Sequence, residues 1–241
     1  MDFENYYIKP ISKNMARKMI VDNHYSHLWT KCSVAFGVFQ RGLENAFFDT
    51  FDDVLLGCVV FGDPIGVDVV NSISPLVGQG SVWELTRLWI QDGTPKNIES
   101  WAIAQSLSYI KKEYPNIKVI ISYADPEFNH RGIVYQASNF LFQEVGIDVK
   151  RWMLSFSDNP YKWHHPKTIM DKYDCNGVKD LKEKMPKPFW LKTTGRKFRY
   201  IYITAGKTEK KKIFNTLKHP AKAYPKDIRN QDILNEIKKY E

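Results

Sequence analysis

One short stretch of the sequence gathers most of the polar side chains that could carry chemistry. Residues 122–131 (SYADPEFNHR) place a serine, a tyrosine, two carboxylates, a histidine and an arginine within ten positions. A carboxylate such as Asp125 can take or orient a proton, and hydroxyl groups can position a substrate. The plainer alternative is that Asp125 and Pro126 form a turn that caps the following helix. The candidate catalytic residues are Ser122, Tyr123 and Asp125, with His130 and Arg131 as substrate contacts.

A second stretch, residues 82–90 (VWELTRLWI), inserts charges into an otherwise apolar strand. Arg87 could contact a donor phosphate or a developing negative charge, with Glu84 and Thr86 as substrate contacts. Charged groups in such a strand need partners or water, and the plainer alternative is a structural pair between Glu84 and Arg87. Strict alternation separates these two residues, so either a β-bulge intervenes or each meets a different partner.

Two histidines and two further tyrosines complete the candidate set. His24 and His27 lie three positions apart, a spacing at which two helical side chains can share a metal ion. No third ligand stands at a telling spacing, so the stronger expectation is that His24, Tyr25 and His27 line the entrance to a site. Tyr135 is either a core aromatic residue or a general acid whose hydroxyl points at the open end of a sheet.

The elements that must position these residues follow from hydrophobic periodicity and capping signals. Three strands joined by loops suit an antiparallel meander, and the strand–helix–strand unit that follows forces a parallel pair. The predicted class is α/β (α+β), with a mixed central sheet and helices on both faces. The predicted strands are 32–40, 54–62, 82–90, 118–124, 149–156 and 198–204, and the predicted helices are 12–23, 97–114 and 129–145, with a short helical piece near 171–184 in an otherwise irregular segment, 157–197.

The charge is unevenly distributed along the chain. Residues 1–149 carry 12 basic and 17 acidic side chains, whereas residues 150–241 carry 23 basic and 10 acidic ones. Aromatic residues interleave with the basic ones in this second segment, a combination that suits phosphates and unpaired bases. The alternative is a solvated, lysine-rich surface. The expected nucleic-acid contacts are Lys192, Arg196, Lys197 and Arg199.

This asymmetry predicts three regions: a catalytic core over 1–156, a basic and aromatic-rich extension over 157–206 that packs on the core and supplies a late strand, and a lysine-rich tail over 207–241. No stretch approaches the roughly 18 apolar residues of a membrane span, and the N-terminus lacks the pattern of a secretion signal. Three widely spaced cysteines form neither a disulfide framework nor a zinc pair. We therefore expect a soluble protein of a reducing, intracellular compartment.

Three of these blocks, in their order and spacing, resemble the Mom proteins of phage Mu and its relatives. The blocks are residues 84–88 (ELTRL), 122–126 (SYADP) and 133–137 (IVYQA); the resemblance covers roughly residues 8–156, with a looser match at 199–202 (RYIY). That family modifies adenine in phage DNA to N6-carbamoylmethyladenine, which blocks host restriction, and its fold is of the GCN5-related N-acetyltransferase type. The resemblance implies this fold and a phage-encoded, acyltransferase-like DNA adenine modification enzyme in the host cytoplasm.

The donor of the transferred group stays open. Acetyltransferases hold the coenzyme A pyrophosphate with a glycine-rich loop after the fourth strand, but residues 91–97 (QDGTPKN) have one glycine, and Pro95 removes an amide donor. This departure argues against ordinary acetyl-CoA binding and fits an altered donor. The candidates are acetyl-CoA held differently and glycyl-tRNA. Iron is associated with the family, but the sequence offers no convincing ligand set.

The leading hypothesis is a transferase that acts on double-stranded DNA with a flipped adenine. It would attach a carbamoylmethyl or related N6-acyl or acetamido group, with tRNA as an optional donor and a homodimer left open. Asp125 would take or orient the amine proton, Arg87 would contact the donor, and Tyr135 would protonate the leaving group. Two alternatives remain: an acetyl-CoA-dependent N-acetyltransferase acting on a protein or small amine, and a non-catalytic nucleic-acid-binding protein on the same scaffold.

Overall fold

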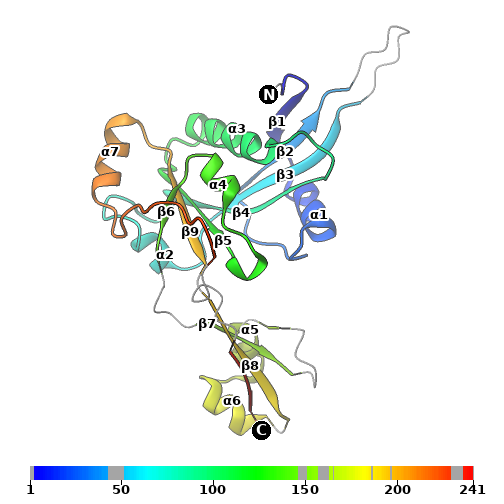
Figure 1. Cartoon of the computed structure of the whole chain (residues 1–241), viewed down its shortest axis with the longest axis vertical. Helices are drawn as coiled ribbons and strands as arrows, with labels where there is room; N and C mark the ends of the chain where they lie inside the picture. Colours follow the sequence, from blue (N-terminus) through cyan, green and yellow to red (C-terminus); the bar gives the residue numbers. More distant parts are fainter. Residues whose placement is uncertain are drawn as a thin grey trace. The chain divides into compact units, whose positions relative to one another are not determined.

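The chain forms two compact units, each assembled from segments that are far apart in the sequence (Figure 1). The computed structural model describes residues 3–42, 52–145, 151–156, 163–164, 166–185, 187–195, 197–228 and 236–240. The large unit comprises Met1–Tyr123, Gly132–Gln143 and Arg199–Ala223, and the small unit comprises Ala124–Arg131, Glu144–Phe198 and Tyr224–Glu241.

The large unit is built on a seven-stranded mixed sheet with the strand order β1-β2-β3-β4-β5-β9-β6. The pairs β1/β2, β2/β3, β3/β4 and β6/β9 are antiparallel, whereas β4/β5 is parallel. The helix α3 (Ile98–Glu113) connects the two parallel strands, as a crossover connection requires. The strands are β1 (Tyr6–Pro10), β2 (Val34–Gln40), β3 (Val54–Gly62), β4 (Val82–Ile90), β5 (Val119–Ala124), β6 (Leu141–Gln143) and β9 (Phe198–Ile203).

Helices cover both faces of this sheet. On one face α1 (Lys13–Asn23) buries Ala16 in a cluster that includes Ala35 of β2. Side chains alternate along a strand, so Phe36 points to the opposite face. There it meets Tyr109 of α3, with ring centroids 5.1 Å apart. The sheet is therefore covered on both sides, which explains why its central strands read as continuous apolar runs.

A further apolar cluster joins two more helices to β4, β5 and β9. α2 (Val67–Asn71) contributes Val70 to it, and α7 (Lys207–Asn215) contributes Ile213. Ile213 is fully buried, so it anchors the lysine-rich helix α7 in the large unit. Among the helices in the described residues, none is long and apolar enough to cross a membrane.

The small unit contains a three-stranded antiparallel sheet with the order β10-β8-β7. Leu154 and Phe189 of this sheet form a core with Ile169 and Leu181 of two helices. The helices thus pack on one face of the small sheet. The elements of the small unit are η1 (Pro126–Phe128), β7 (Arg151–Ser155), α5 (Pro166–Tyr173), α6 (Val178–Lys184), β8 (Phe189–Thr194) and β10 (Ile237–Tyr240).

Most predicted elements of the large unit are confirmed. The strands predicted at 54–62 and 82–90 have those bounds. Ser12 caps α1, because its Oγ accepts a hydrogen bond of 3.2 Å from the Met15 N–H. The mixed sheet with helices on both faces confirms the predicted α/β class.

The helix predicted over 129–145 is wrong. Its helical part, α4 (Ile133–Ala137), is five residues long and is followed by β6. Asn139 adopts a left-handed conformation with a φ of 60°, which an asparagine tolerates and which stops the helix. Asn129 likewise has a φ of 58° and ends η1 instead of capping a helix. The apolar residues after Asn139 therefore form a strand, β6, where the sequence pattern predicted a continuing helix.

The small unit also differs from expectation. The strand predicted over 149–156 is β7, which belongs to the small sheet, and the segment 157–197 contains α5, α6 and β8 where it was predicted to be largely irregular. The regions predicted from charge run consecutively along the chain, whereas both units are discontinuous. Those regions stay a prediction about domain organisation.

Candidate active site

The backbone pairing between the parallel strands β4 and β5 ends at the level of the polar residues. Their ladder joins Glu84 to Ile121 as its last pair, although β4 continues to Ile90 and β5 to Ala124. Just beyond this point the buried Ser122 Oγ donates a hydrogen bond of 3.0 Å to the Leu85 carbonyl. A side chain thus bridges the strands where the backbone ladder stops.

A β-bulge at Thr86 explains how the two charges of β4 come together. Glu84 is paired with Gly62, and Arg87 with Val60, so Thr86 is the extra residue of β4. Its Oγ1 donates to the Val60 carbonyl at 3.2 Å. Because the bulge shifts the alternation by one residue, Glu84 and Arg87 lie on the same face of the sheet. Of the two possibilities left open by the sequence, the bulge is confirmed.

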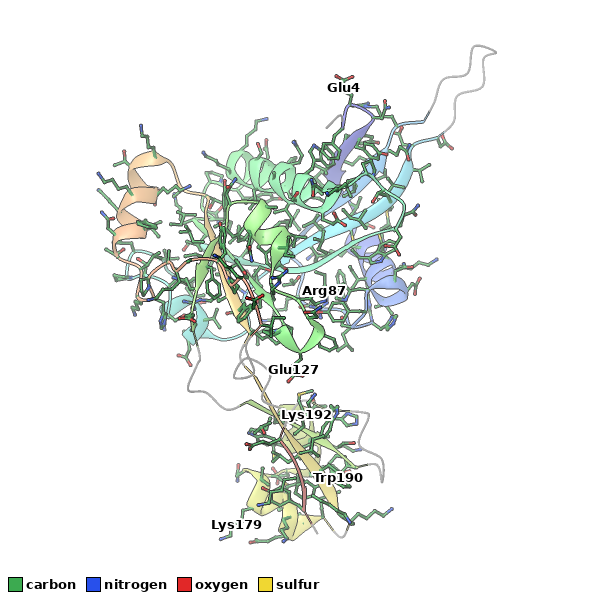
Figure 2. All side chains as sticks on the ribbon, in the orientation of Figure 1. Glu4, Arg87, Glu127, Lys179, Trp190 and Lys192 are labelled. Carbon is green, nitrogen blue, oxygen red and sulfur yellow. The ribbon has the colours of Figure 1, made fainter. Side chains whose placement is uncertain are left out.

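Arg87, which is labelled in Figure 2, is half-buried, and two backbone carbonyls accept hydrogen bonds from its guanidinium. Its Nε donates to the Leu28 carbonyl at 3.1 Å and its Nη1 to the Thr86 carbonyl at 2.7 Å. Burial lowers the pKa of the Arg87 guanidinium, while the nearby Tyr25, Glu84 and Tyr135 favour its charged form. Two of the five N–H groups of a guanidinium are therefore used to fix its position.

Tyr135 of α4 lies beside these charges. Burial raises the pKa of its hydroxyl most strongly, and Glu84 and Tyr25 add to the rise. A hydrogen bond with Ser122 and the charge of Arg87 act in the opposite direction. A group of five side chains from β4, β5, α4 and the segment after α1 is thus electrostatically coupled. We call these residues the Tyr135 cluster: Tyr25, Glu84, Arg87, Ser122 and Tyr135.

A glycine and a second tyrosine position α4. Gly132 has a φ of 77°, and a Cβ at this position would overlap the ring of Tyr200 in β9. Gln136 donates through its Nε2 to the Tyr200 hydroxyl at 3.0 Å, and the rings of Tyr135 and Tyr200 lie 5.4 Å apart. This support for α4 was not predicted from the sequence. The one local indication was Gly132, a residue that tolerates a positive φ, directly before the apolar residues of α4.

The two histidines are accounted for by local hydrogen bonds. His24 ends α1 with an extended backbone, and its Nδ1 accepts from the Ser26 N–H at 3.1 Å. His27 is exposed and places its Nδ1 2.9 Å from the Val21 carbonyl. Within the part of the chain that the structure describes, no three His, Cys, Asp or Glu side chains are grouped to hold a metal. These residues do not fit an iron site.

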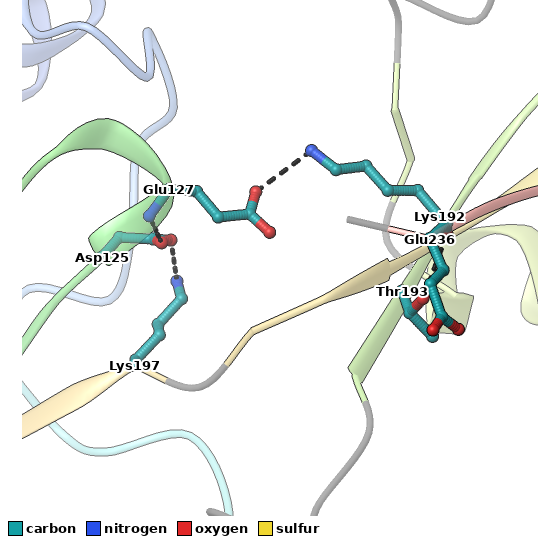
Figure 3. A network of polar contacts seen from close by, with 6 residues as sticks. All are labelled: Asp125, Glu127, Lys192, Thr193, Lys197 and Glu236. Atoms are coloured by element: carbon teal, nitrogen blue, oxygen red, sulfur yellow. Dashed lines mark hydrogen bonds and ion pairs between the residues drawn. The ribbon is translucent and has the colours of Figure 1, made fainter. Parts of the chain in front are cut away.

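Asp125 and Glu127 form ion pairs within the small unit (Figure 3). The Asp125 Oδ1 accepts from the Glu127 N–H at 3.1 Å, and its Oδ2 lies 3.4 Å from the Lys197 Nζ. Glu127 Oε2 lies 3.1 Å from the Lys192 Nζ. The turn-capping interpretation of Asp125 is thereby confirmed, for a 3-10 helix. A catalytic role for Asp125 stays a prediction.

Two more predicted substrate contacts also lie in the small unit. His130 is exposed, and its backbone N–H donates to the Asp125 carbonyl at 3.2 Å. The Arg131 Nη1 donates to the Lys226 carbonyl. Their assignment as substrate contacts stays a prediction.

Arg199, predicted to contact nucleic acid, is buried instead, with 2% of its surface exposed. Its Nε donates to Gln143 Oε1 at 3.0 Å and its Nη1 to Ser72 Oγ at 2.6 Å. Burial lowers the pKa of Arg199, whereas its interaction with Tyr123 raises it. Arg199 of β9 therefore links the end of α2 to β6, and its interaction with Tyr123 adds β5 to this group. Of the other predicted nucleic-acid contacts, Lys192 and Lys197 are the ion-paired lysines of the small unit, and Arg196 lies outside the described residues.

A family comparison bears on all of these residues. The model of the Mom protein family matches residues 5–226. This chain belongs to the Mom protein family. It is 27% identical over 220 residues to "Methylcarbamoylase mom" of Escherichia phage Mu, an alignment that covers 91% of this chain and 83% of that relative. The relative is named as an enzyme, and the family match at residues 5–226 spans the large unit almost completely but leaves out β10 of the small unit.

Two solved structures align with most of this chain at low sequence identity. One is NAA60 of Arabidopsis thaliana in complex with a bisubstrate analogue (TM-score 0.43, 11% identity, 82% of this chain and 98% of that chain). Another is an N-acetyltransferase from Staphylococcus aureus Mu50 (TM-score 0.38, 11% identity, 83% of this chain and 97% of that chain). The α/β fold of this Mom-family chain is assigned from the strand order of its own sheet.

The loop between β4 and α3 of this Mom-family chain uses its polar groups internally. Thr94 Oγ1 donates to the Gln91 carbonyl at 3.1 Å, and the Pro95 carbonyl accepts from the Ile98 N–H at 3.2 Å. Asn97 stands at the N-cap position of α3 with a φ of 70° and no side-chain cap hydrogen bond. This loop does not fit the glycine-rich cradle that holds a pyrophosphate.

Proposed function

We propose that this chain transfers a carbamoylmethyl group, or a related two-carbon amide, to the N6 amine of adenine in DNA. The group is suggested by the name of the phage Mu relative and by the resemblance of the three sequence blocks to Mom proteins. The Tyr135 cluster at the end of the β4/β5 ladder carries the proposal. It joins the half-buried Tyr135, the cation of Arg87 and the buried hydroxyl of Ser122 in one unit.

The reaction needs help at both ends of the transferred group. A bond forms between adenine N6 and a carbon of the donor, and the bond from that carbon to the leaving group breaks. The amine loses one proton, and the leaving group gains one. Adenine N6 is conjugated with the ring and is a poor nucleophile, so the enzyme must hold it against the donor. Protonation of the leaving group lowers the barrier further.

Tyr135 is suited to protonate the leaving group. A tyrosine phenol is protonated at neutral pH, so its proton is present when the leaving group departs. Burial raises the pKa of Tyr135 and makes it a weaker acid, but the Ser122 hydrogen bond and the Arg87 charge act in the opposite direction and favour release of the proton. Ser122 can rotate its hydroxyl to donate to the tyrosinate that remains, because its hydrogen bond is one of the interactions that lower the pKa of Tyr135. Ser122 would otherwise donate to the Leu85 carbonyl, as it does in the resting state.

Arg87 is suited to stabilise negative charge on the donor. Two carbonyls fix its guanidinium, so its remaining N–H groups keep a defined direction. Glu84 lies on the same face of the bulged strand and favours the charged form of Arg87. Tyr25 is 58% exposed yet interacts with Arg87 and Tyr135, which suits a residue at the entrance. Asp125 stays the predicted acceptor of the amine proton.

The large unit also offers a surface suited to the DNA backbone. This surface is the lysine-rich helix α7. Its acidic residue, Glu209, is already paired with Lys118, with 2.9 Å between Glu209 Oε2 and Lys118 Nζ. Positive charges on one short helix release counterions when they meet phosphates, which favours binding. The target adenine would leave the duplex to reach the cluster. The exposed lysines of α7 are Lys207, Lys210, Lys211 and Lys212.

Nucleoside mass spectrometry of DNA from cells that express the full chain tests this function. We expect an N6-modified deoxyadenosine whose added mass gives the composition of the two-carbon group and whose fragmentation distinguishes the carbamoylmethyl isomer from the glycyl isomer. Cells that express the chain with Tyr135→Phe at equal level are the control and should contain far less of it. Unmodified adenine with folded wild-type protein contradicts the proposal. Tight binding of coenzyme A in calorimetry, with no DNA modification, would favour an acetyltransferase instead.

The two candidate donors can be separated in the same assay. Purified chain supplied with acetyl-CoA, or with glycyl-tRNA, is mixed with DNA in which adenine is isotopically labelled. Attack of N6 on the acyl carbon of glycyl-tRNA, with loss of the tRNA, would give N6-glycyladenine, an isomer of the carbamoylmethyl product. Attack on acetyl-CoA, with loss of coenzyme A, would give N6-acetyladenine, which lacks the amide nitrogen, so the product formed identifies the donor. If neither yields product while DNA from expressing cells is modified, the donor belongs to another chemical class and the transferase assignment stands.

A further inference from the structure

The small sheet has two unlike faces. Phe189 of β8 and Leu154 of β7 lie on the face that α5 and α6 cover. Trp190 follows Phe189 in β8 and therefore points to the opposite face. In the register of the sheet, Trp190 is paired with Lys239 of β10 on one side and with Ser155 of β7 on the other. The face away from the helices thus carries an aromatic ring and a cation side by side.

A second tryptophan extends this row. His164 is bridged to Leu154, so the antiparallel continuation of that bridge places Trp163 next to Ser155. Ser155 is fully buried, as expected for a small side chain between two indole rings. The row across the strands is therefore Trp163, Ser155, Trp190 and Lys239.

Two lysines lie over these rings. The Lys239 Nζ is 5.8 Å from the centroid of the Trp190 ring, and the Lys192 Nζ is 5.7 Å from that of Trp163. Lys192 is 18% exposed and also pairs with Glu127, so its ammonium group contacts protein groups more than solvent. Lys239 is exposed, and both tryptophans are half-buried, so part of each ring reaches solvent. We call these four residues the tryptophan face: Trp163, Trp190, Lys192 and Lys239.

We infer that the tryptophan face binds unpaired nucleotides. Indole rings stack on bases whatever their sequence, and an adjacent lysine neutralises the phosphate that follows. Both tryptophans are half-buried on the sheet face opposite α5 and α6. Protein interfaces are depleted in lysine, so a lysine-flanked tryptophan row suits nucleic acid better than a protein partner. The inference rests on the proposed function for its class of ligand. The unpaired strand is DNA opened around the flipped adenine, because the proposed function acts on DNA.

Fluorescence anisotropy with the full chain tests this binding. Labelled oligothymidine, oligouridine and a DNA duplex are titrated with wild type and with Trp190→Ala, at one fixed salt concentration. We expect Trp190→Ala to weaken binding of the single strand about tenfold, the effect of removing one stacked base, and to change duplex binding less. Trp190→Phe should keep most of the affinity, because phenylalanine also stacks.

A charge variant and a matched control complete the design. Lys239→Glu should weaken single-strand binding and flatten its salt dependence by the equivalent of about one phosphate contact. Lys179→Glu makes the same charge change on the exposed surface of α6, away from the tryptophan face, and should leave affinity near wild type (Figure 2). Circular dichroism confirms that each variant is folded.

The outcomes are distinct. A preference of wild type for oligothymidine over oligouridine supports DNA as the occupant, and a preference for oligouridine overturns it. Equal single-strand affinity of folded Trp190→Ala and wild type overturns the inference, as does an effect of Lys179→Glu as large as that of Lys239→Glu. If adenine is modified but Trp190→Ala binds normally, only this inference fails. If single-strand affinity depends on Trp190 but adenine is never modified, only the proposed function fails.

Discussion

The Tyr135 cluster of the large unit and the Asp125 turn of the small unit contain similar side chains in unlike situations. In the turn, each carboxylate faces a lysine, and Asp125 also caps a backbone N–H. In the cluster, Arg87 is held by neutral carbonyls, and Tyr135 has a raised pKa because it is buried among charges. The density of polar residues in the sequence favoured the turn, whereas our proposal assigns the donor contact and the proton of the leaving group to the cluster and leaves the amine proton to Asp125.

The largest effect that separates the two regions is expected for Tyr135→Phe. The change removes only the hydroxyl that would protonate the leaving group. Loss of a general acid lowers a rate by about a thousandfold, so modified adenine should nearly vanish. The rate of adenine modification is measured at saturating DNA. Tyr202→Phe, in β9, is a matched control that should keep near-normal activity. Activity of Tyr135→Phe within threefold of wild type would remove the hydroxyl from the mechanism.

Arg199→Ala should act on stability. The change leaves Ser72 and Gln143 without their buried partner and opens a cavity, which we expect to cost about 3 kcal/mol of the free energy of unfolding. Urea denaturation measures this cost. Activity per folded molecule should survive, in contrast to the Tyr135 variant. A loss below about 0.5 kcal/mol would mean that Arg199 does not hold these strands together.

Arg87→Lys should act on activity with little effect on stability. Lysine keeps the charge but loses the planar fork that the Leu28 and Thr86 carbonyls fix. Loss of one oriented donor at a site of developing charge lowers a rate by about a hundredfold. The measurement is the same modification assay, with the urea midpoint as the control for folding. A stable, fully active Arg87→Lys protein would show that Arg87 supports structure alone.

Asp125→Asn separates the capping of the turn from chemistry. Asparagine also caps helices, and the Lys197 partner is 48% exposed, so the free energy of unfolding should change by less than about 1 kcal/mol. If Asp125 takes the amine proton, the modification rate should fall at least about tenfold, because an amide cannot accept it. Lys197→Ala is the paired control for loss of the ion pair. Full activity of Asp125→Asn would leave Asp125 as a structural cap.

The smallest effect is a dependence of stability on alkaline pH. Because the pKa of Tyr135 is raised in the folded state, its contribution is fully present below the unfolded pKa of about 10 and is lost as pH rises through the higher folded value. The stability of wild type should therefore decline more steeply than that of Tyr135→Phe above roughly pH 10. Urea midpoints of both proteins between about pH 8 and 11 measure the difference. Parallel curves would contradict a buried, protonated Tyr135.

The sequence predicted the central sheet well because its strands carry their own signal. The continuous apolar run at 54–62 and the capping serine at position 12 are local features, and both were confirmed. β1 was missed because Lys9 and Pro10 look unlike a strand, although a proline is tolerated at a sheet edge. The bulge at Thr86 was foreseen as a possibility from the placement of Glu84 and Arg87, which a regular strand could not satisfy together.

Other features depended on contacts between distant segments and had no local signal. The burial of Arg199 requires Ser72 and Gln143, which lie 127 and 56 positions away in the chain. The small sheet forms only because β10 returns from the C-terminal end to pair with β8. Asn139 was the one local sign that the helix predicted over 129–145 had to stop, and apolar residues on both sides of it concealed that sign.

The most direct test of the account is a crystal structure of the full chain with a DNA oligonucleotide that contains the target adenine. The account predicts that the adenine is extruded and that its N6 edge and the donor lie beside Tyr135, with hydrogen bonds of about 3 Å linking bound groups to the Tyr135 hydroxyl or the Arg87 guanidinium. An extruded adenine bound elsewhere, with the Tyr135 cluster closed by its own side chains, would contradict it.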